Sequence, residues 1–120
     1  MSDPTAEPTT FDTQLTPDAL DPERPVPFDT PWGHFALYTI EGRVVCAESF
    51  CPHLLGPLFQ GTQSADEVTC PWHMWRFSLT TGECTHAPTK EAMATIRIRR
   101  LAVEIAETGT FVLRPEDDGA

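Results

Sequence analysis

Residues 51–73 read CPHLLGPLFQGTQSADEVTCPWH and contain the feature that most restricts the fold. Cys51-Pro52-His53 opens this stretch and Cys70-Pro71-Trp72-His73 closes it, with sixteen residues between His53 and Cys70. Each segment offers one soft thiolate and one imidazole on a short loop that proline stiffens. Two cysteines and two histidines that converge in this way make a four-ligand metal site. The sequence therefore predicts two loops that meet around a metal centre.

Short extended segments joined by turns are expected on both sides of these loops. Apolar and polar residues alternate, and pairs such as Glu41-Gly42 and Thr81-Gly82 mark the turns. One helical turn is expected after Thr16-Pro17, and the 12 prolines argue against long helices. This pattern predicts an all-β fold, an antiparallel sandwich or barrel. The expected strands are Phe11–Leu15, Val26–Asp29, Phe35–Thr39, Arg43–Glu48, Val68–Cys70, Trp75–Leu79, Ile96–Arg99, Val103–Ile105 and Phe111–Leu113.

The length of 120 residues suits a single domain, which we expect at residues 11–114. Residues 1–10 are rich in Pro, Thr and acids and are expected to form a disordered tail, and residues 115–120 an acidic C-terminal tail. No apolar run is long enough for a membrane span or a signal peptide, so we expect no membrane association. A cytoplasmic location is expected, where four cysteines are more often metal ligands than disulfides.

The net charge of −10 is concentrated at the ends of the chain. Residues 1–30 carry a net −6 and residues 115–120 a net −3. A nucleic-acid partner is disfavoured, because phosphate binding needs clustered Lys and Arg. The acidic flanks serve either to steer a basic protein partner or only to keep the protein soluble, and the sequence leaves both interpretations open.

The spacing Cys-x-His followed by a distant Cys-x-x-His resembles the Rieske iron–sulfur family. The resemblance covers roughly residues 11–114 and implies an antiparallel β fold with two cluster-binding loops at one end. It also implies one 2Fe–2S cluster, with Cys51 and Cys70 on one iron and His53 and His73 on the outer iron. The supporting segments are Gly56-Pro57-Leu58 with Gly61, Trp72-His73, Trp75-Arg76-Phe77 and Thr81-Gly82-Glu83.

The implied ligand set bears on the reduction potential. With neutral imidazoles the oxidised cluster has no net charge, whereas four thiolates would make it a dianion, so histidine ligation raises the potential. High-potential members of the family place hydroxyl donors where this chain has Trp75 and Phe77, and a disulfide where it has Gly56 and Trp72. With fewer donors to the cluster, we expect a potential near about −150 mV rather than +300 mV.

The chain departs from the family pattern at two loop positions. Leu55 and Met74 stand where the family usually has glycine, a residue that permits unusual backbone angles. Gly56 could replace the first glycine through a shift of one residue, and nothing in the sequence replaces the second. Leu54, Leu55 and Met74 form an apolar rim that either docks a partner or shields the cluster from water.

The resemblance implies a soluble one-electron carrier rather than an enzyme. It would pass electrons from a flavin or NAD(P)H-dependent reductase to a ring-hydroxylating oxygenase. A second, mononuclear iron site would need two histidines and a carboxylate, and only His34 and His86 remain once the cluster is assigned. One alternative is the small Rieske-like subunit of a reductase complex such as nitrite reductase. The other is an interaction module stabilised by structural zinc on the same four ligands.

The other cysteines, histidines, tryptophans and arginines are expected to have structural roles. Cys84-Thr85-His86 repeats the Cys-x-His spacing but lacks a matching partner segment, and Cys46 lies in an apolar strand and is expected in the core. His34 is expected to be a solvated loop residue. Two larger sets are also given structural roles: Trp32, Trp72 and Trp75 as packing around the loops, and Arg97, Arg99 and Arg100 as a solvated strand face.

Overall fold

Six antiparallel strands from both ends of the chain form the larger of two sheets. The computed structural model describes residues 9–21, 23–52, 56–72 and 74–116. The strand order is β1-β10-β9-β4-β3-β2, so the N-terminal hairpins join the C-terminal hairpin where β4 pairs with β9. The predicted tails were residues 1–10 and 115–120, of which residues 1–8 and 117–120 lie outside the described residues. Pro115 is the last residue of the strand Phe111–Pro115. The strands are β1 (Phe11–Asp12), β2 (Val26–Thr30), β3 (Gly33–Ile40), β4 (Arg43–Glu48), β9 (Arg100–Ile105) and β10 (Phe111–Pro115).

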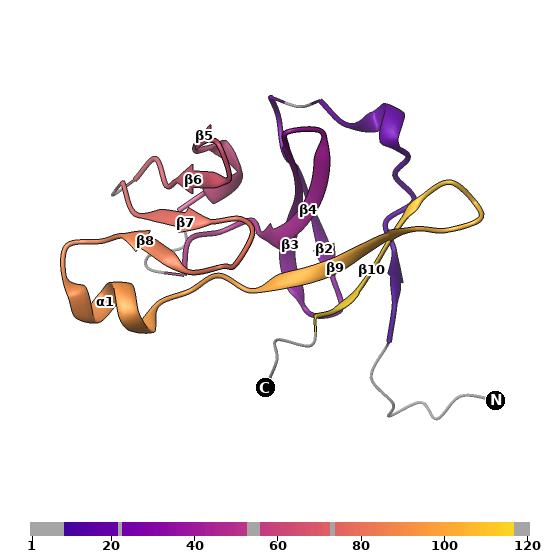
Figure 1. Cartoon of the computed structure of the whole chain (residues 1–120). Coiled ribbons are helices and arrows are strands. Elements are labelled where there is room, and N and C mark those ends of the chain that lie inside the picture. The colour runs from indigo at the N-terminus through magenta and orange to yellow at the C-terminus, as the bar shows by residue number, and fades with distance from the viewer. Residues whose placement is uncertain (1–8, 22, 53–55, 73, 117–120) are drawn as a thin grey trace.

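A second sheet is inserted between β4 and β9. Its four strands are antiparallel and follow one another in chain order. Figure 1 shows this sheet beside the larger one, with the chain passing from β4 into it and returning through β9. The all-β prediction is therefore confirmed. The strands are β5 (Thr62–Ser64), β6 (Glu67–Thr69), β7 (Arg76–Ser78) and β8 (Cys84–His86).

Three short helices connect the strands, and one of them corrects the sequence analysis. The helical turn expected near Pro17 is present as η1 (Pro17–Ala19), and a second one, η2 (Leu58–Gln60), follows the first cysteine loop. Helix α1 (Lys90–Thr95) was not predicted; it begins at Thr89, whose Oγ1 accepts a hydrogen bond from the Ala92 N–H at 3.1 Å. The expected strand at 96–99 was wrong, since this segment runs irregularly from α1 to β9. None of the helices in the described part of the chain is long and apolar enough to cross a membrane.

Strand β3 is buried on both faces, which explains its continuous apolar run. Leu37 faces one core cluster together with Cys46, whereas the adjacent Tyr38 faces a second cluster that contains Cys51 and Cys70. Successive side chains of a strand point to opposite faces, so a strand between two cores must be apolar throughout. The cysteines of both loops are thus anchored in the packed core that joins the two sheets.

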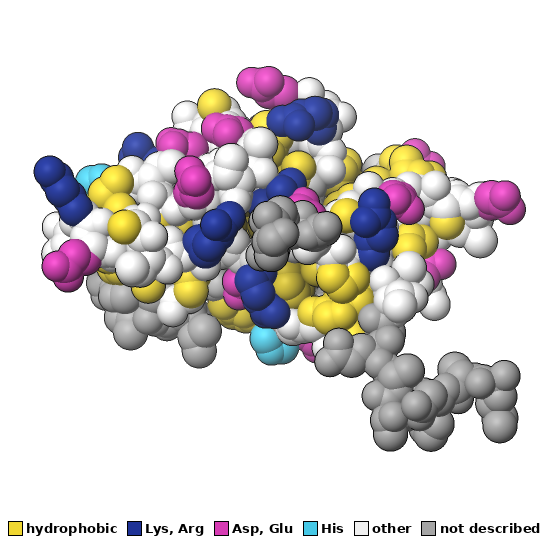
Figure 2. Space-filling model, turned by 60° about the horizontal axis from the view of Figure 1, so that its bottom comes forward, with side chains coloured by type: hydrophobic (Ala, Val, Ile, Leu, Met, Phe, Trp, Pro, Cys, Tyr) yellow, Lys and Arg dark blue, Asp and Glu magenta, His cyan; other side chains and the backbone are white. Residues whose placement is uncertain are grey.

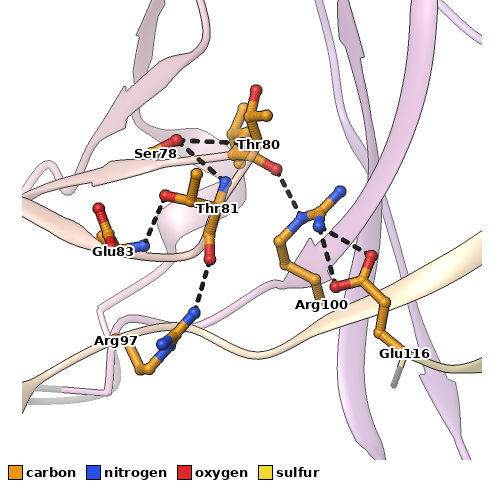
Figure 3. A network of polar contacts seen from close by, with 8 residues as sticks. Ser78, Thr80, Thr81, Glu83, Arg97, Arg100 and Glu116 are labelled. Atoms are coloured by element: carbon orange, nitrogen blue, oxygen red, sulfur yellow. Dashed lines mark hydrogen bonds and ion pairs between the residues drawn. The ribbon is translucent and has the colours of Figure 1, made fainter. Parts of the chain in front are cut away.

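Arg100 ties the second sheet to the larger one (Figure 3). Its Nε donates to the Leu79 carbonyl at 2.8 Å, and its Nη1 donates to both carboxylate oxygens of Glu116 at 2.8 and 2.9 Å. The Arg100 side chain is 19% exposed and that of Glu116 is 31% exposed. A charge-assisted pair at this depth is screened less than a surface ion pair.

The prediction that Arg97, Arg99 and Arg100 form a solvated strand face was correct only in part: Arg97 and Arg99 are exposed, but they precede β9, and all three donate to backbone carbonyls. Arg97 Nη2 donates to the Thr81 carbonyl at 2.7 Å, closing the β7–β8 turn (Figure 3). Arg99 Nη1 donates to the Trp32 carbonyl at 3.0 Å, and its guanidinium carbon lies 5.1 Å from the centre of a phenylalanine ring in β3. The three arginines donate to carbonyls of turns and loops, which have no partner in a strand ladder.

Candidate metal centre

The first cysteine loop is closed at its base by two backbone contacts. It leaves the end of β4, and Phe50 forms an isolated antiparallel bridge with Pro57. The Cys51 N–H donates to the Gly56 carbonyl at 2.7 Å. Cys51 is 1% exposed and packs in the core between the sheets. The backbone thus holds Cys51 at the fixed base of the loop, while His53, Leu54 and Leu55 lie outside the described residues.

The second cysteine loop is the end of the β6–β7 hairpin. The Cys70 N–H donates to the Trp75 carbonyl at 2.7 Å, which extends the ladder by one pair beyond the strands. The Met74 N–H donates back to the Cys70 carbonyl at 3.0 Å. Cys70 and Trp75 are 1% and 6% exposed, so both ends of the loop are packed. His73, the other proposed ligand of this loop, lies outside the described residues.

Met74 adopts the backbone conformation that glycine would supply. Its φ is +62°, in the left-handed region, although the residue carries a Cβ. This conformation costs about 1–2 kcal/mol for an ordinary L-residue. The departure from the family pattern at this position therefore preserves the turn at the cost of strain.

The two loops touch at Gly56. A Cβ on Gly56 would lie 2.9 Å from Cys70 Sγ and 3.1 Å from two ring carbons of Trp72. The φ of Gly56 is not in the left-handed region, so the suggestion that it replaces the missing first glycine by conformation was wrong. Gly56 is instead required because the first loop passes directly against the second thiol.

The residues present suit an iron–sulfur cluster. None of the four cysteines, all of which are described, forms a disulfide. Cys51 and Cys70 lie on adjoining loops, and the thiol of Cys70 sits in a cradle that a single Cβ would fill. Buried thiolate pairs on rigid loops are the donors that iron–sulfur clusters use.

The two remaining cysteines lie on strands outside these loops, although Cys84 packs in the same core cluster as Cys51 and Cys70. Cys46 is fully buried in the other core cluster, and burial raises the pKa of its thiol. Cys84 lies in β8, where burial likewise raises the pKa of the thiol; its hydrogen bond to the His86 carbonyl, at 3.4 Å, opposes that shift. Burial therefore favours the protonated form of both thiols.

A polar pair beside the first loop was not predicted. His34 was expected to be a solvated loop residue, whereas in the structure it belongs to β3 and lies opposite Asp29 of β2. His34 Nδ1 contacts Asp29 Oδ1. Counting outward from the turn at 31–32 would have paired these two positions, because residues flanking a hairpin turn face each other.

Comparison with known proteins identifies the family. The Rieske [2Fe-2S] domain matches residues 14–116. The chain is 32% identical over 72 residues to the ferredoxin component of the naphthalene 1,2-dioxygenase system of Pseudomonas putida, covering 58% of this chain and 69% of that protein. Two other curated relatives are much longer proteins, and the chain spans only 13% of one and 16% of the other.

Solved structures give the same result for the fold. The ferredoxin of carbazole 1,9a-dioxygenase from Nocardioides aromaticivorans IC177 matches with a TM-score of 0.74 and 25% identity, over 91% of this chain and 100% of that one. A complex of reduced oxygenase and oxidized ferredoxin in carbazole 1,9a-dioxygenase matches with a TM-score of 0.74 and 21% identity, over 90% of this chain and 94% of that one. The match to the domain favours an iron–sulfur cluster over structural zinc. The chain belongs to the Rieske [2Fe-2S] domain family, which indicates a Rieske-type 2Fe–2S cluster.

Proposed function

We propose that this protein carries single electrons from a flavin or NAD(P)H-dependent reductase to an oxygenase-type partner. We further propose that Cys51 and Cys70 hold one iron of the cluster and that His53 and His73 hold the other. When bound, the cluster accepts and releases one electron. The observation that carries the proposal is the contact of the two loops at Gly56, which places one thiol from each loop in the same buried region.

The second loop offers a surface on which a partner can approach the cluster. Trp72 and Met74 are 58% and 60% exposed, and both belong to the loop that holds Cys70. The Trp72 ring also packs against Gly56, so it touches both loops while facing solvent. Exposed apolar side chains at a redox centre favour a short-lived contact with another protein, because they can be buried on docking. This supports the docking interpretation of Met74 in the rim; Leu54 and Leu55 lie outside the described residues.

The charge of the protein favours a basic partner. The chain has 18 acidic residues against eight Lys and Arg. Figure 2 shows that on one face basic side chains are interspersed with acidic ones, so this face carries no large patch of one sign. An excess of negative charge over the whole molecule still raises the rate of encounter with a positively charged protein, and salt reduces that effect.

Electron paramagnetic resonance of the dithionite-reduced protein tests the ligand proposal. Mixed thiolate and imidazole ligation gives a spectrum distinct from that of an all-thiolate cluster, and zinc gives none. Exchanging either proposed imidazole, in His53→Cys or His73→Cys, should lower the potential or lose the cluster. The matched control is His86→Cys, which makes the same exchange beside Cys84 in β8. An unchanged potential in His53→Cys and His73→Cys would remove both histidines from the ligand set.

Reconstitution tests the direction of transfer. The holoprotein is mixed with a purified reductase and an aromatic-ring dioxygenase, and product formation is measured with and without it. We expect turnover only when the holoprotein is present. Transfer to a nitrite reductase instead would favour the alternative of a fixed reductase subunit.

A further inference from the structure

A hollow of about 390 Å³ lies beside the first cysteine loop, at the edge of the larger sheet. Its position is set by four neighbouring segments: β2, the start of β3, the residues that follow β4, and η2. Its volume falls in the range of about 300–1,000 Å³ that is typical of sites for small ligands. Its lining includes Phe28, Asp29, His34, Ser49, Phe50 and Phe59.

Three polar side chains form a row along this hollow. Asp29 pairs with His34 in the β2–β3 register, and the Ser49 N–H donates to the His34 carbonyl at 3.2 Å. Residues directly opposite each other on antiparallel strands point to the same face of the sheet. Asp29, His34 and Ser49 therefore lie side by side on one face, in that order.

The acidic end of the row is open to a ligand. Asp29 Oδ1 contacts His34 Nδ1, yet the Asp29 side chain remains 82% exposed. Its carboxylate can therefore accept further hydrogen bonds from a donor that enters the hollow.

The other end of the row has an unused hydrogen-bonding group. Ser49 is 1% exposed, and its hydroxyl oxygen has no hydrogen-bond partner among the described residues. Its accessible area is below 1 Å², so a ligand in the hollow does not reach it. The acceptor that the hollow offers to a ligand is therefore the exposed Asp29 carboxylate at the other end of the row.

The walls of the hollow are aromatic. The Phe50 ring meets His34 edge-on, with ring centres 5.5 Å apart, and meets Phe59 in the same way at 6.0 Å. Phe28 lines another side, and no Lys or Arg of the described chain lines the hollow. Aromatic faces attract cations. Among the cations of proteins, the guanidinium suits an aromatic face best, because it is planar and can stack on the ring.

We infer that this hollow binds the guanidinium group of an arginine side chain, presented by the redox partner. The inference rests on the proposed function for the identity of the partner. The flat cation stacks on a phenylalanine ring of the wall while its N–H groups donate to the Asp29 carboxylate. An ammonium group is compact and cannot stack in this way. Since Phe50 directly precedes Cys51, an arginine bound here would fix the partner beside the first cysteine loop.

The test is a titration of the oxidised holoprotein with N-acetyl-arginine methylamide, followed by the NMR signals of the labelled Phe and His side chains. We expect saturable shifts in the signals of His34 and Phe59. The citrulline analogue, which has the same shape without the charge, and the lysine analogue should each bind at least tenfold more weakly. Equal binding of the lysine analogue, or no saturable shift with arginine, would overturn the inference.

Variants locate the binding site. Asp29→Asn should weaken arginine binding at least tenfold, whereas Ser49→Ala should leave it unchanged, because the Ser49 hydroxyl is buried out of reach of the ligand. The matched control is Glu107→Gln, which removes one exposed carboxylate on the β9–β10 turn, away from the hollow. Identical affinity in Asp29→Asn and Glu107→Gln would show that the probe responds only to net charge and would refute the site.

Iron content and paramagnetic resonance of the same samples separate this inference from the proposed function. A normal cluster in a protein that ignores arginine refutes the hollow alone. A protein without a cluster refutes the proposed function, whereas the titration still decides the inference, because the hollow is built from protein side chains only.

Discussion

The replacement Gly56→Ala should disturb the cluster through a single methyl group. Gly56 belongs to the first cysteine loop, and the added Cβ would lie 2.9 Å from Cys70 Sγ in the second. It would also lie 3.1 Å from two carbons of the Trp72 ring, so it would press on two side chains of the second loop at once. The two loops must therefore separate.

The size of that separation follows from the contact distances. Ordinary van der Waals contact begins at 3.4 Å, so Cys70 Sγ and the new methyl group must part by about 0.5 Å. Metal–ligand distances are held within about 0.2 Å, so a displacement of this size exceeds what a ligand sulfur tolerates. Overpacking of this kind costs about 1–3 kcal/mol. We expect less iron and sulfide per chain and a melting temperature lower by about 4–12 °C.

The assay combines iron and labile sulfide analysis, the paramagnetic resonance spectrum and thermal unfolding of the anaerobically purified protein. Gly109→Ala is the matched control: a Cβ there meets nothing within 4 Å, although its φ of +86° makes the substitution strained. The control should lose about 1 kcal/mol of stability and keep a full cluster. Full iron content and an unaltered spectrum in Gly56→Ala would refute the claim that the loops meet against the Cys70 thiol.

Three further predictions concern strain, an ion pair and pH. Met74→Gly should raise the free energy of unfolding by about 0.5–1 kcal/mol, because it relieves the left-handed backbone at a φ of +62°; Met74→Ala keeps its Cβ and should give no gain in thermal unfolding. Glu116→Gln should lower stability by about 1–2 kcal/mol in denaturant titrations, since it leaves the largely buried Arg100 without its charged partner; no change would show that the pair is fully screened. Burial raises the pKa values of the Cys46 thiol and the Tyr38 hydroxyl, so the unfolded chain releases these protons above about pH 9 while the folded protein retains them. The free energy of unfolding should therefore fall as pH rises beyond that point, and more gently in Cys46→Ala; equal slopes would contradict the assignment.

Local sequence patterns were sufficient wherever neighbouring residues decide the structure. The strand at Arg43–Glu48 was predicted with its observed bounds, because Glu41-Gly42 forms the turn before it and the apolar run that follows is sharply bounded. Strand β5 (Thr62–Ser64) was not predicted, because three polar residues carry no alternation; pairing with β6 makes this segment a strand. A strand of that kind is imposed by its neighbour and has no signal of its own.

The segment before β9 likewise depends partly on local sequence and partly on distant contacts. The alternation at 96–99 predicts a strand, and Ile98 is buried as a strand residue would be. The preceding helix was missed because its only strong signal is the cap at Thr89, ahead of six residues. After this helix, Arg97 and Arg100 donate to carbonyls of the β7–β8 turn, and these contacts hold the backbone in its irregular path. Such contacts join residues far apart in sequence, and no local period reports them.

For the candidate site, the sequence by itself determined the donor types, their spacing and hence the family, because metal chemistry depends on which atoms a short loop presents. The resemblance also marked Met74 as a position that the family usually fills with glycine, and only the structure shows that Met74 itself takes the left-handed backbone conformation. Only the tertiary structure decided that Gly56 lies against the Cys70 thiol and that Asp29, His34 and Ser49 share one face. The physical reason is that these contacts depend on strand register and loop packing, which bring together residues separated by long stretches of chain.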